Sequence, residues 1–370
     1  MKAVSILFIV FTSIHGLIHL MGFLAYWPLV KLSALPYKTS LLNGRWEAGA
    51  GGMRLVSLVL LLAALGFLAA AALLALKMPA WAPVMLLSTL LSIALCILDW
   101  QAALRGFWID VFILVVLFFV FGLRVKPAPF EAYAGQAGAV TTTAIPAGLP
   151  APVERFYHIY HGDAVPVYKS AVFSGRGTVR FMGITLPARL RFTHQSGEGY
   201  RHYIETTFYG IPIMKVNERY LEGHTRLELP FGVVENDPKV DGAANQGLWG
   251  ETMFYPAAFL TYPGVRWEAV DETSARLYVP FGDEEQIFRV RFDPQTGMMQ
   301  RMETRRYRDE KVGELGWWGD INQAAGEEGQ PERTSFTVTW EDEGSPWLKA
   351  ELEEVVFNSE VREYIRQRGP

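Results

Sequence analysis

The chain has 370 residues, half of them hydrophobic, with a single cysteine and a formal net charge of −4. Residues 1–126 hold nine basic and three acidic residues, net +6, whereas residues 127–370 have a net charge of −10. An acidic second part without a Lys/Arg cluster argues against nucleic acid as a partner, and against this part lying flat on an anionic lipid surface. The single Cys96 excludes an internal disulfide, a CxxC redox pair and a cysteine-rich zinc site.

Four apolar stretches occupy the first part of the chain, at about 4–30, 55–76, 80–98 and 107–123. Each approaches the roughly 20 residues that a helix needs to cross a bilayer, so we expect an integral membrane domain of four helices over residues 1–126. The first stretch is too long for a signal peptide and lacks a small-x-small cleavage site, so we expect it to be retained. The flanking basic residues favour a cytoplasmic first loop and an extracytoplasmic C-terminal domain.

The first stretch contains the sequence "HGLIHLMGF", in which His15 and His19 are four residues apart and share one helix face. The pair has three possible roles: hydrogen bonding between helices, binding of a metal or haem, or proton and quinone chemistry. Other possible metal ligands in the spans are Asp99, Asp110, Cys96 and Met21. No other span contains a histidine that could be a second axial haem ligand, so helix packing is the favoured role.

The composition changes after Lys126. Residues 127–150 are rich in Ala, Gly, Pro and Thr without a period, which predicts a flexible linker before a soluble domain over 151–370. That domain begins with a short amphipathic helix, because apolar side chains recur at i, i+3, i+4 and i+7. These are Val153, Phe156, Tyr157 and Tyr160.

Short alternating runs separated by tight turns predict an antiparallel sheet of about ten strands. In "EQIFRVRFD", Phe288, Val290 and Phe292 face one way. Arg289 and Arg291 face the other way. A sheet of this length must curl into a barrel or half-barrel, or split into a sandwich. We therefore expect an α+β soluble domain, a curled antiparallel half-barrel with covering helices.

One segment, "DGAANQGLWGETMFYPAAFL" at 241–260, is apolar and helix-prone instead. Residues 245–260 are expected to act as a lid or plug of a cavity in the curled sheet. Glu251 is the only charge after Asp241, and is either a cap or rim carboxylate or a buried functional acid. If the segment is a lid, polar replacements of Trp249 and Phe254 should remove a bound lipid and leave the fold intact.

The remaining histidines mark no clear site. His158 and His161 share a helix face with Glu154, and Asp163 follows; this is either a zinc or nickel site or a solvated face. The others, in separate strand-like runs, are His194, His202 and His224. The chain has no GxSxG, GxxxxGK[ST] or GxGxxG motif, so we expect neither a catalytic residue nor a cofactor.

Two sequences, "HGLIHLMGF" and "SIALCILDWQAALRGFWIDVFIL", resemble the four-span module of an uncharacterised family of bacterial membrane proteins. Members join this module to a β-rich domain of unknown function, which is similar here in "QGLWGETMFYPAAFL" and "FDPQTGMMQRMETRRY". The resemblance implies the bacterial inner membrane. The chain departs from the family pattern at Gln101 and Ala102, where an acidic residue is expected after the tryptophan. The element order also resembles the half-barrel of bacterial lipoprotein carriers, which encloses an apolar ligand.

Together these features favour a membrane protein whose tethered β domain binds or passes a lipid or another apolar ligand. The candidate ligand contacts are Trp249, Glu251, Met253, Phe254, Tyr255, Trp267, Trp318 and Trp340. One alternative is a non-catalytic envelope scaffold or assembly protein. A second is a membrane redox or metal-binding protein that uses His15 and His19.

Overall fold

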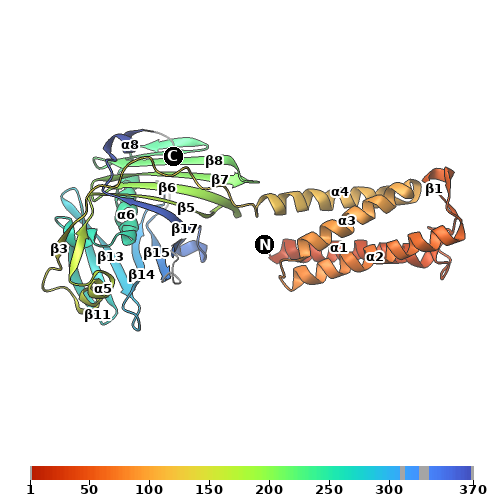
Figure 1. The fold of residues 1–370 in the computed structure, drawn as a ribbon, viewed down its shortest axis with the longest axis horizontal. Coiled ribbons are helices and arrows are strands. Elements are labelled where there is room, and N and C mark those ends of the chain that lie inside the picture. The colour runs from red at the N-terminus through yellow and green to blue at the C-terminus, as the bar shows by residue number, and fades with distance from the viewer. Residues whose placement is uncertain (1, 309–312, 325–332, 368–370) are drawn as a thin grey trace. The chain divides into compact units, whose positions relative to one another are not determined.

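The computed structural model describes residues 2–308, 313–324 and 333–367. Its contacts divide the chain into two compact units, Met1–Gly122 and Leu123–Pro370. The first unit is helical and the second is dominated by one large antiparallel sheet (Figure 1).

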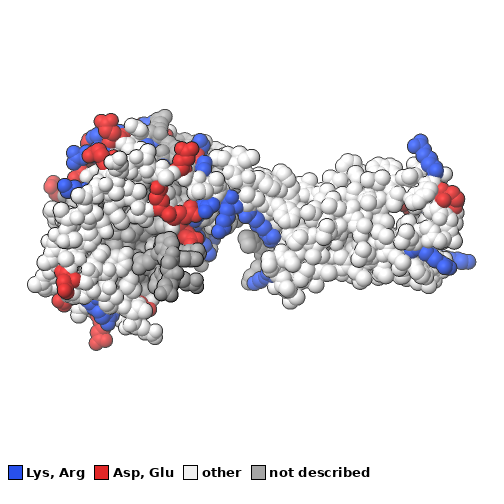
Figure 2. Space-filling view, in the orientation of Figure 1, with Lys and Arg blue, Asp and Glu red and all other residues white. Residues whose placement is uncertain are grey.

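The helical unit consists of α1 (Lys2–Tyr26), α2 (Gly49–Ala75), α3 (Trp81–Leu98) and α4 (Trp100–Gly122). Within the described residues, these four helices are long and apolar enough to cross a membrane, with mean hydropathies of 2.0 to 2.8. Their outward side chains are large and apolar, and Figure 2 shows almost no charge along the helices. Helices α2 and α4 begin earlier than the apolar stretches, because each helix includes residues of lower hydropathy at its start, such as Arg54, Gln101 and Arg105. The loop between α1 and α2 spans residues 27–48 and contains β1 (Ser40–Leu41), η1 (Leu42–Gly44) and β2 (Trp46–Glu47).

The described residues of the second unit form a thirteen-stranded sheet, where the sequence predicts about ten strands. Its strands are β5 (Ser170–Phe181), β6 (Ile184–Gln195), β7 (Gly199–Phe208), β8 (Ile211–Leu221), β9 (His224–Leu229), β10 (Gly232–Glu235), β11 (Arg266–Asp271), β12 (Ser274–Phe281), β13 (Glu284–Phe292), β14 (Met299–Arg306), β15 (Leu315–Ala324), β16 (Arg333–Trp340) and β17 (Leu348–Phe357). The strand order is β10-β9-β8-β7-β6-β5-β17-β16-β15-β14-β13-β12-β11, and all neighbours are antiparallel. The sheet therefore consists of two meanders joined between β5 and β17. A separate pair is formed by β3 (Thr141–Ala144) and β4 (Ala164–Val167).

Glycines in β5 permit the junction between the two meanders. A Cβ atom added to Gly177 would overlap the carbonyl oxygen of Lys349 and the backbone of Ala350, its partners in β17. Gly175 meets the carbonyl of Glu351 in the same way. The close approach of β17 to β5 therefore requires residues without a side chain.

The sheet is strongly curled, as a sheet of this length must be. Figure 1 shows β5–β8 running across β13–β15, with α6 (Pro238–Glu251) inside the bend. The remaining helices are α5 (Ala151–His161), η2 (Thr252–Phe254), α7 (Ala258–Thr261), η3 (Glu341–Glu343) and α8 (Arg362–Arg366). Helix α5 buries Val153, Phe156 and Tyr157 in the core, with Tyr160 packed at its margin, as the helical spacing predicts.

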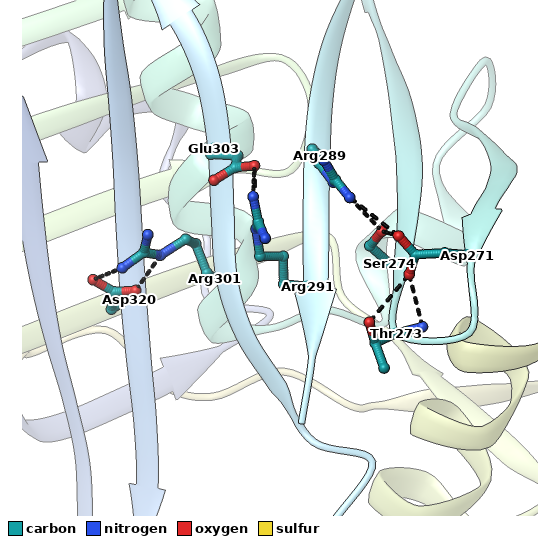
Figure 3. Close-up of polar contacts among 8 residues, drawn as sticks. All are labelled: Asp271, Thr273, Ser274, Arg289, Arg291, Arg301, Glu303 and Asp320. Carbon is teal, nitrogen blue, oxygen red and sulfur yellow. Dashed lines mark hydrogen bonds and ion pairs between the residues drawn. The ribbon is translucent and has the colours of Figure 1, made fainter. Parts of the chain in front are cut away.

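The two faces of β13 follow the predicted alternation. Phe288, Val290 and Phe292 are buried in the core. On the other face, Arg289 pairs with Asp271 of β11, two strands away, and Arg291 pairs with Glu303 of the neighbouring β14. Figure 3 shows this ladder, which includes Arg289 with Asp271 at 3.1 Å, Arg291 with Glu303 at 2.7 Å and Arg301 with Asp320 at 2.6 Å. Exposed pairs of this kind contribute at most about 1 kcal/mol each, so the core face carries the stability.

Part of the segment 127–150, expected to be a flexible linker, has contacts with the sheet. The Arg176 guanidinium donates to the carbonyl of Pro127 at 2.9 Å, and Arg191 donates to the carbonyl of Glu131. Phe130 lies 4.4 Å from the Arg189 guanidinium. Because these bonds use backbone carbonyls of the segment, its composition does not reveal them.

Candidate functional site

A cavity of about 540 Å³ lies in the curled sheet of the second unit. One part of its lining is apolar and comes from β6–β9 and β16, including Phe192, Ile204, Met214, Val216, Leu227 and Val338. Another part is polar and includes Tyr200, His202, Glu218, Glu251 and Arg306. The cavity therefore offers both an apolar surface and a charged group to a ligand.

Strand register brings the polar side chains together. In the hairpin β6–β7, His194 pairs with Tyr200 and Phe192 pairs with His202, so both histidines lie on the core face. In the next hairpin, His202 pairs directly with Glu218 of β8. The sequence "HQSGEGYRH" contained this signal, because a tight turn between two alternating strands places His194 and His202 on one face.

Glu251, the last residue of α6, meets both histidines. Its Oε2 atom lies 2.9 Å from His194 Nε2 and 2.6 Å from His202 Nε2. The shorter contact lacks the alignment of a hydrogen bond. The second ring nitrogens have oxygen neighbours too: His194 Nδ1 lies 3.1 Å from the Tyr255 hydroxyl, and His202 Nδ1 lies 3.5 Å from Glu218. The imidazoles are thus held from both sides.

The pKa values of the two histidines are shifted in opposite directions. Burial opposes the charged form of His202, but the charges of Glu251 and Glu218 outweigh it and raise the His202 pKa to about 9. Burial dominates at His194 and lowers its pKa, despite the bond to Glu251. Burial alone would raise the Glu251 pKa, yet His202 and His194 lower it to about 2. Glu251 is therefore a carboxylate at neutral pH.

Arg306, at the end of β14, adds a positive charge at the cavity. Its guanidinium carbon lies 4.9 Å from the Trp317 ring centre and 5.6 Å from that of Trp340. Its Nε atom is buried and has no hydrogen-bond partner in the described part of the chain. Burial lowers the Arg306 pKa, against the opposing effects of Tyr200, Glu218 and Glu251. Arg306 is thus a partly buried cation with donor capacity left for a ligand.

The structure separates the predicted ligand contacts into three groups. Glu251 and Trp340 line the cavity. Core positions are occupied by Trp249, Met253, Phe254 and Tyr255, of which only Tyr255 reaches the polar group through its hydroxyl. Trp267 packs at the edge of the core against Phe259 and Phe292, and Trp318 lies over Arg301 in the outer-face ladder.

Residues 245–260 are therefore a plug inside the sheet, not a movable lid. Trp249 is fully buried beside Phe259 and Tyr262, and Phe254 packs between Phe173 and Phe336. The expectation that polar replacements here leave the fold intact is corrected, because such replacements would remove core packing and bury unpaired polar groups.

In the helical unit, His15 and His19 take part in a buried hydrogen-bond network. His15 Nε2 lies 2.8 Å from Asp110 Oδ1, and the Ser92 hydroxyl joins Asp110 Oδ2 at 2.5 Å to His19 Nε2 at 2.8 Å. The network connects α1, α3 and α4, which supports the helix-packing role. A smaller cavity of about 290 Å³ is lined by His15, His19 and Asp99, among others.

The other residues predicted as possible metal ligands are not arranged around a common point. His158 is half-exposed and lies 3.7 Å from the exposed Asp163. Burial lowers the pKa of His161, whose ring stacks on Tyr157. Within the described residues, the group of three possible metal ligands is His194, His202 and Glu251. Sequence reasoning named Glu251 and missed its two partners.

Residues 139–351 match the model of the "Family of unknown function (DUF6544)". The chain belongs to this family. The match confirms the resemblance to an uncharacterised family that the sequence suggests. A comparison of this DUF6544 protein with curated proteins gives no match.

The solved structures that are similar to the DUF6544 chain include the following two. One is a DUF1329 family protein from Desulfovibrio piger, at 11% identity and TM-score 0.30, covering 60% of this chain and 98% of that chain. The other is a putative outer membrane lipoprotein-sorting protein domain from Vibrio parahaemolyticus, at 12% identity and TM-score 0.28, covering 58% and 92%. With TM-scores this low, neither similarity decides the function.

Proposed function

We propose that the β unit binds an amphiphilic, lipid-like molecule while the four helices hold the protein in a membrane. The apolar chain of the ligand lies along the apolar wall of the cavity, and its polar head meets Arg306, His202 and Glu251. The observation that carries this proposal is one cavity with both an apolar wall and a partly buried charged group.

The volume and lining of the cavity support a ligand of this kind. About 540 Å³ falls within the range of small-molecule pockets, which is roughly 300–1,000 Å³. Each methylene group that leaves water for such a wall contributes about 0.8 kcal/mol. An acyl chain thus gains affinity from length alone.

The polar part of the lining supports an anionic head group. The Arg306 side chain has donor capacity left, and a phosphate or carboxylate next to a partly desolvated guanidinium forms charge-assisted hydrogen bonds. The carboxylates of Glu218 and Glu251 repel an anionic head group, so the negative charge of the ligand lies next to Arg306.

Membrane insertion is supported by the helical unit. Its exposed surface carries many large apolar side chains, such as Leu7, Leu62, Leu87 and Phe118. So large an apolar surface is unfavourable in water and is typical of contact with lipid. The basic residues of the first loop favour its cytoplasmic placement in the bacterial inner membrane.

Photolabelling tests the ligand. Full-length protein is placed in nanodiscs containing phosphatidylglycerol with a diazirine on its acyl chain, irradiated and digested. Peptides of β6–β9 are expected to be labelled. Val216→Trp, which fills the cavity from β8, should reduce this labelling at least about fivefold. The matched control is Ile213→Trp, because Ile213 lies on the same strand and is half-exposed outside the cavity. Labelling confined to the helices, or equal labelling in both variants, would contradict the proposal.

Head-group preference is tested on Arg306. We expect wild-type β peptides to be labelled more by diazirine phosphatidylglycerol than by diazirine phosphatidylcholine. Arg306→Gln should lower this ratio about tenfold, since it removes a charge-assisted contact worth about 1.5 kcal/mol. Arg308→Gln is the control, because Arg308 also lines the cavity but is already paired with Asp342 and Glu343. A ratio that Arg306→Gln leaves unchanged would remove Arg306 from the head-group site.

The scaffold alternative requires a sheet without a pocket, and the cavity argues against it. The redox or metal alternative at His15 and His19 has less support, because both imidazoles are engaged by Asp110 and Ser92.

A further inference from the structure

We infer that His194, His202 and Glu251 bind a divalent transition-metal ion, for which Zn²⁺ fits the donor set best. Two imidazoles and one carboxylate are ligands that zinc accepts readily. This inference shares His202 and Glu251 with the proposed head-group site, but it does not depend on the lipid ligand, because it rests on the convergence of three donor atoms and not on the apolar wall of the cavity.

The three donor atoms already converge. They all lie within 4.8 Å of one another, and Glu251 Oε2 lies 2.9 Å and 2.6 Å from the two Nε2 atoms. Ligands of a tetrahedral zinc ion at about 2.1 Å lie roughly 3.3 Å apart, so an ion requires each donor to shift by less than about 1 Å. The donors come from β6, β7 and α6, three packed elements that hold them in place.

The direction of the His202 ring fits this assignment. The His202 Nε2 atom contacts Glu251 Oε2 without aligning for a hydrogen bond. Two ligands of one ion lie side by side in this manner, since both point at the metal and not at each other. His194 Nε2 is hydrogen-bonded to the same carboxylate oxygen at 2.9 Å, and a bound ion would replace this bond with two metal–ligand bonds.

Neighbouring oxygens hold the far side of each imidazole. His194 Nδ1 lies against the Tyr255 hydroxyl, and His202 Nδ1 lies near Glu218. Tyr200 in turn donates its hydroxyl to Glu218 at 2.8 Å. Metal-binding histidines usually have such a partner on the second nitrogen, which orients the ring and leaves the first nitrogen for the metal.

The cavity supplies an open coordination position. His202 and Glu251 line it, so a bound ion would face the space that the proposed head group occupies. When His194 and His202 bind a metal ion as neutral imidazoles, His202 has lost its proton, and the two carboxylates Glu218 and Glu251 then exceed the single cation Arg306 by one negative charge. A dication reverses this balance and leaves a net positive group, which suits an anionic ligand.

The test measures metal content. Full-length protein without a polyhistidine tag is stripped with a chelator, exposed to Zn²⁺ or Co²⁺, freed of excess ion and analysed by mass spectrometry of the metal. About one ion per chain is expected, with visible d–d bands for Co²⁺ of low coordination number. His194→Gln, His202→Gln and Glu251→Gln should each weaken the binding at least about 100-fold, and Glu218→Gln about 10- to 100-fold. His224→Gln is the matched control, because that ring is 78% exposed and lies outside the group.

A second measurement guards against variants that fail to fold. Micromolar Zn²⁺ should raise the thermal unfolding midpoint of the full-length wild-type protein by about 5 °C, and should raise that of full-length His224→Gln equally. A wild-type protein with less than a tenth of an equivalent of metal and no thermal shift would overturn the inference. Full metal content in a folded Glu251→Gln variant would overturn it as well, because the ion would then be bound elsewhere.

Discussion

Gly177→Ala is expected to abolish folding of the β unit, or to destabilise it by more than about 4 kcal/mol. A single added methyl group overlaps the carbonyl oxygen of Lys349, and the backbone of Ala350 lies directly behind it. No rotamer change relieves an overlap between a Cβ atom and backbone. Strands β5 and β17 would have to separate, and these strands join the two meanders of the sheet.

Chemical unfolding of the full chain, followed by tryptophan fluorescence, measures this effect. Gly232→Ala is the matched control, because Gly232 also lies in a strand and a Cβ atom there meets nothing within 4 Å. We expect the control to change the free energy of unfolding by less than about 1 kcal/mol. A Gly177→Ala protein with the wild-type midpoint would show that β17 does not pair with β5 in this register.

Asp110→Ala is expected to destabilise the helical unit by about 3–5 kcal/mol. Asp110 is fully buried and accepts bonds from His15 and Ser92, which link α1 and α3 to α4. Its removal leaves both groups without their partner in an apolar interior, where unsatisfied polar groups are costly.

Thermal unfolding of the detergent-solubilised chain tests this prediction. Thr89→Val is the control, because Thr89 is equally buried but bonds only to the carbonyl of Met85 in its own helix, at 2.8 Å. We expect a clear loss of stability in Asp110→Ala and little change in Thr89→Val. Equal stability of the two variants would mean that the network does not hold the helices together.

Local patterns were sufficient wherever one element decides the outcome. The apolar stretches predicted the four helices, because a helix of this length and hydropathy is a property of its own residues. The period of two in β13 placed Phe288, Val290 and Phe292 inside, and the period of 3.6 in α5 did so for Val153, Phe156 and Tyr157. The half-barrel followed from the number of short strands and the need of a long sheet to curl.

The candidate site was only partly predictable. The sequence marks Glu251 as the only charge after Asp241 in an apolar segment, but it gives no sign that His194 and His202 lie beside it, because about fifty residues of chain separate them from Glu251. Hairpin register places the two rings on one face, whereas the position of α6 inside the bend depends on packing across the whole sheet.

Patterns in consecutive residues thus predict the four long apolar helices of the first unit and the curled antiparallel sheet of the second. Both predictions follow from the spacing of apolar residues within single segments. Only the folded chain shows that residues 245–260 are a plug, that three donor atoms converge and that the cavity has both an apolar wall and a charged group. These depend on distances between segments far apart in the chain, which no local pattern encodes.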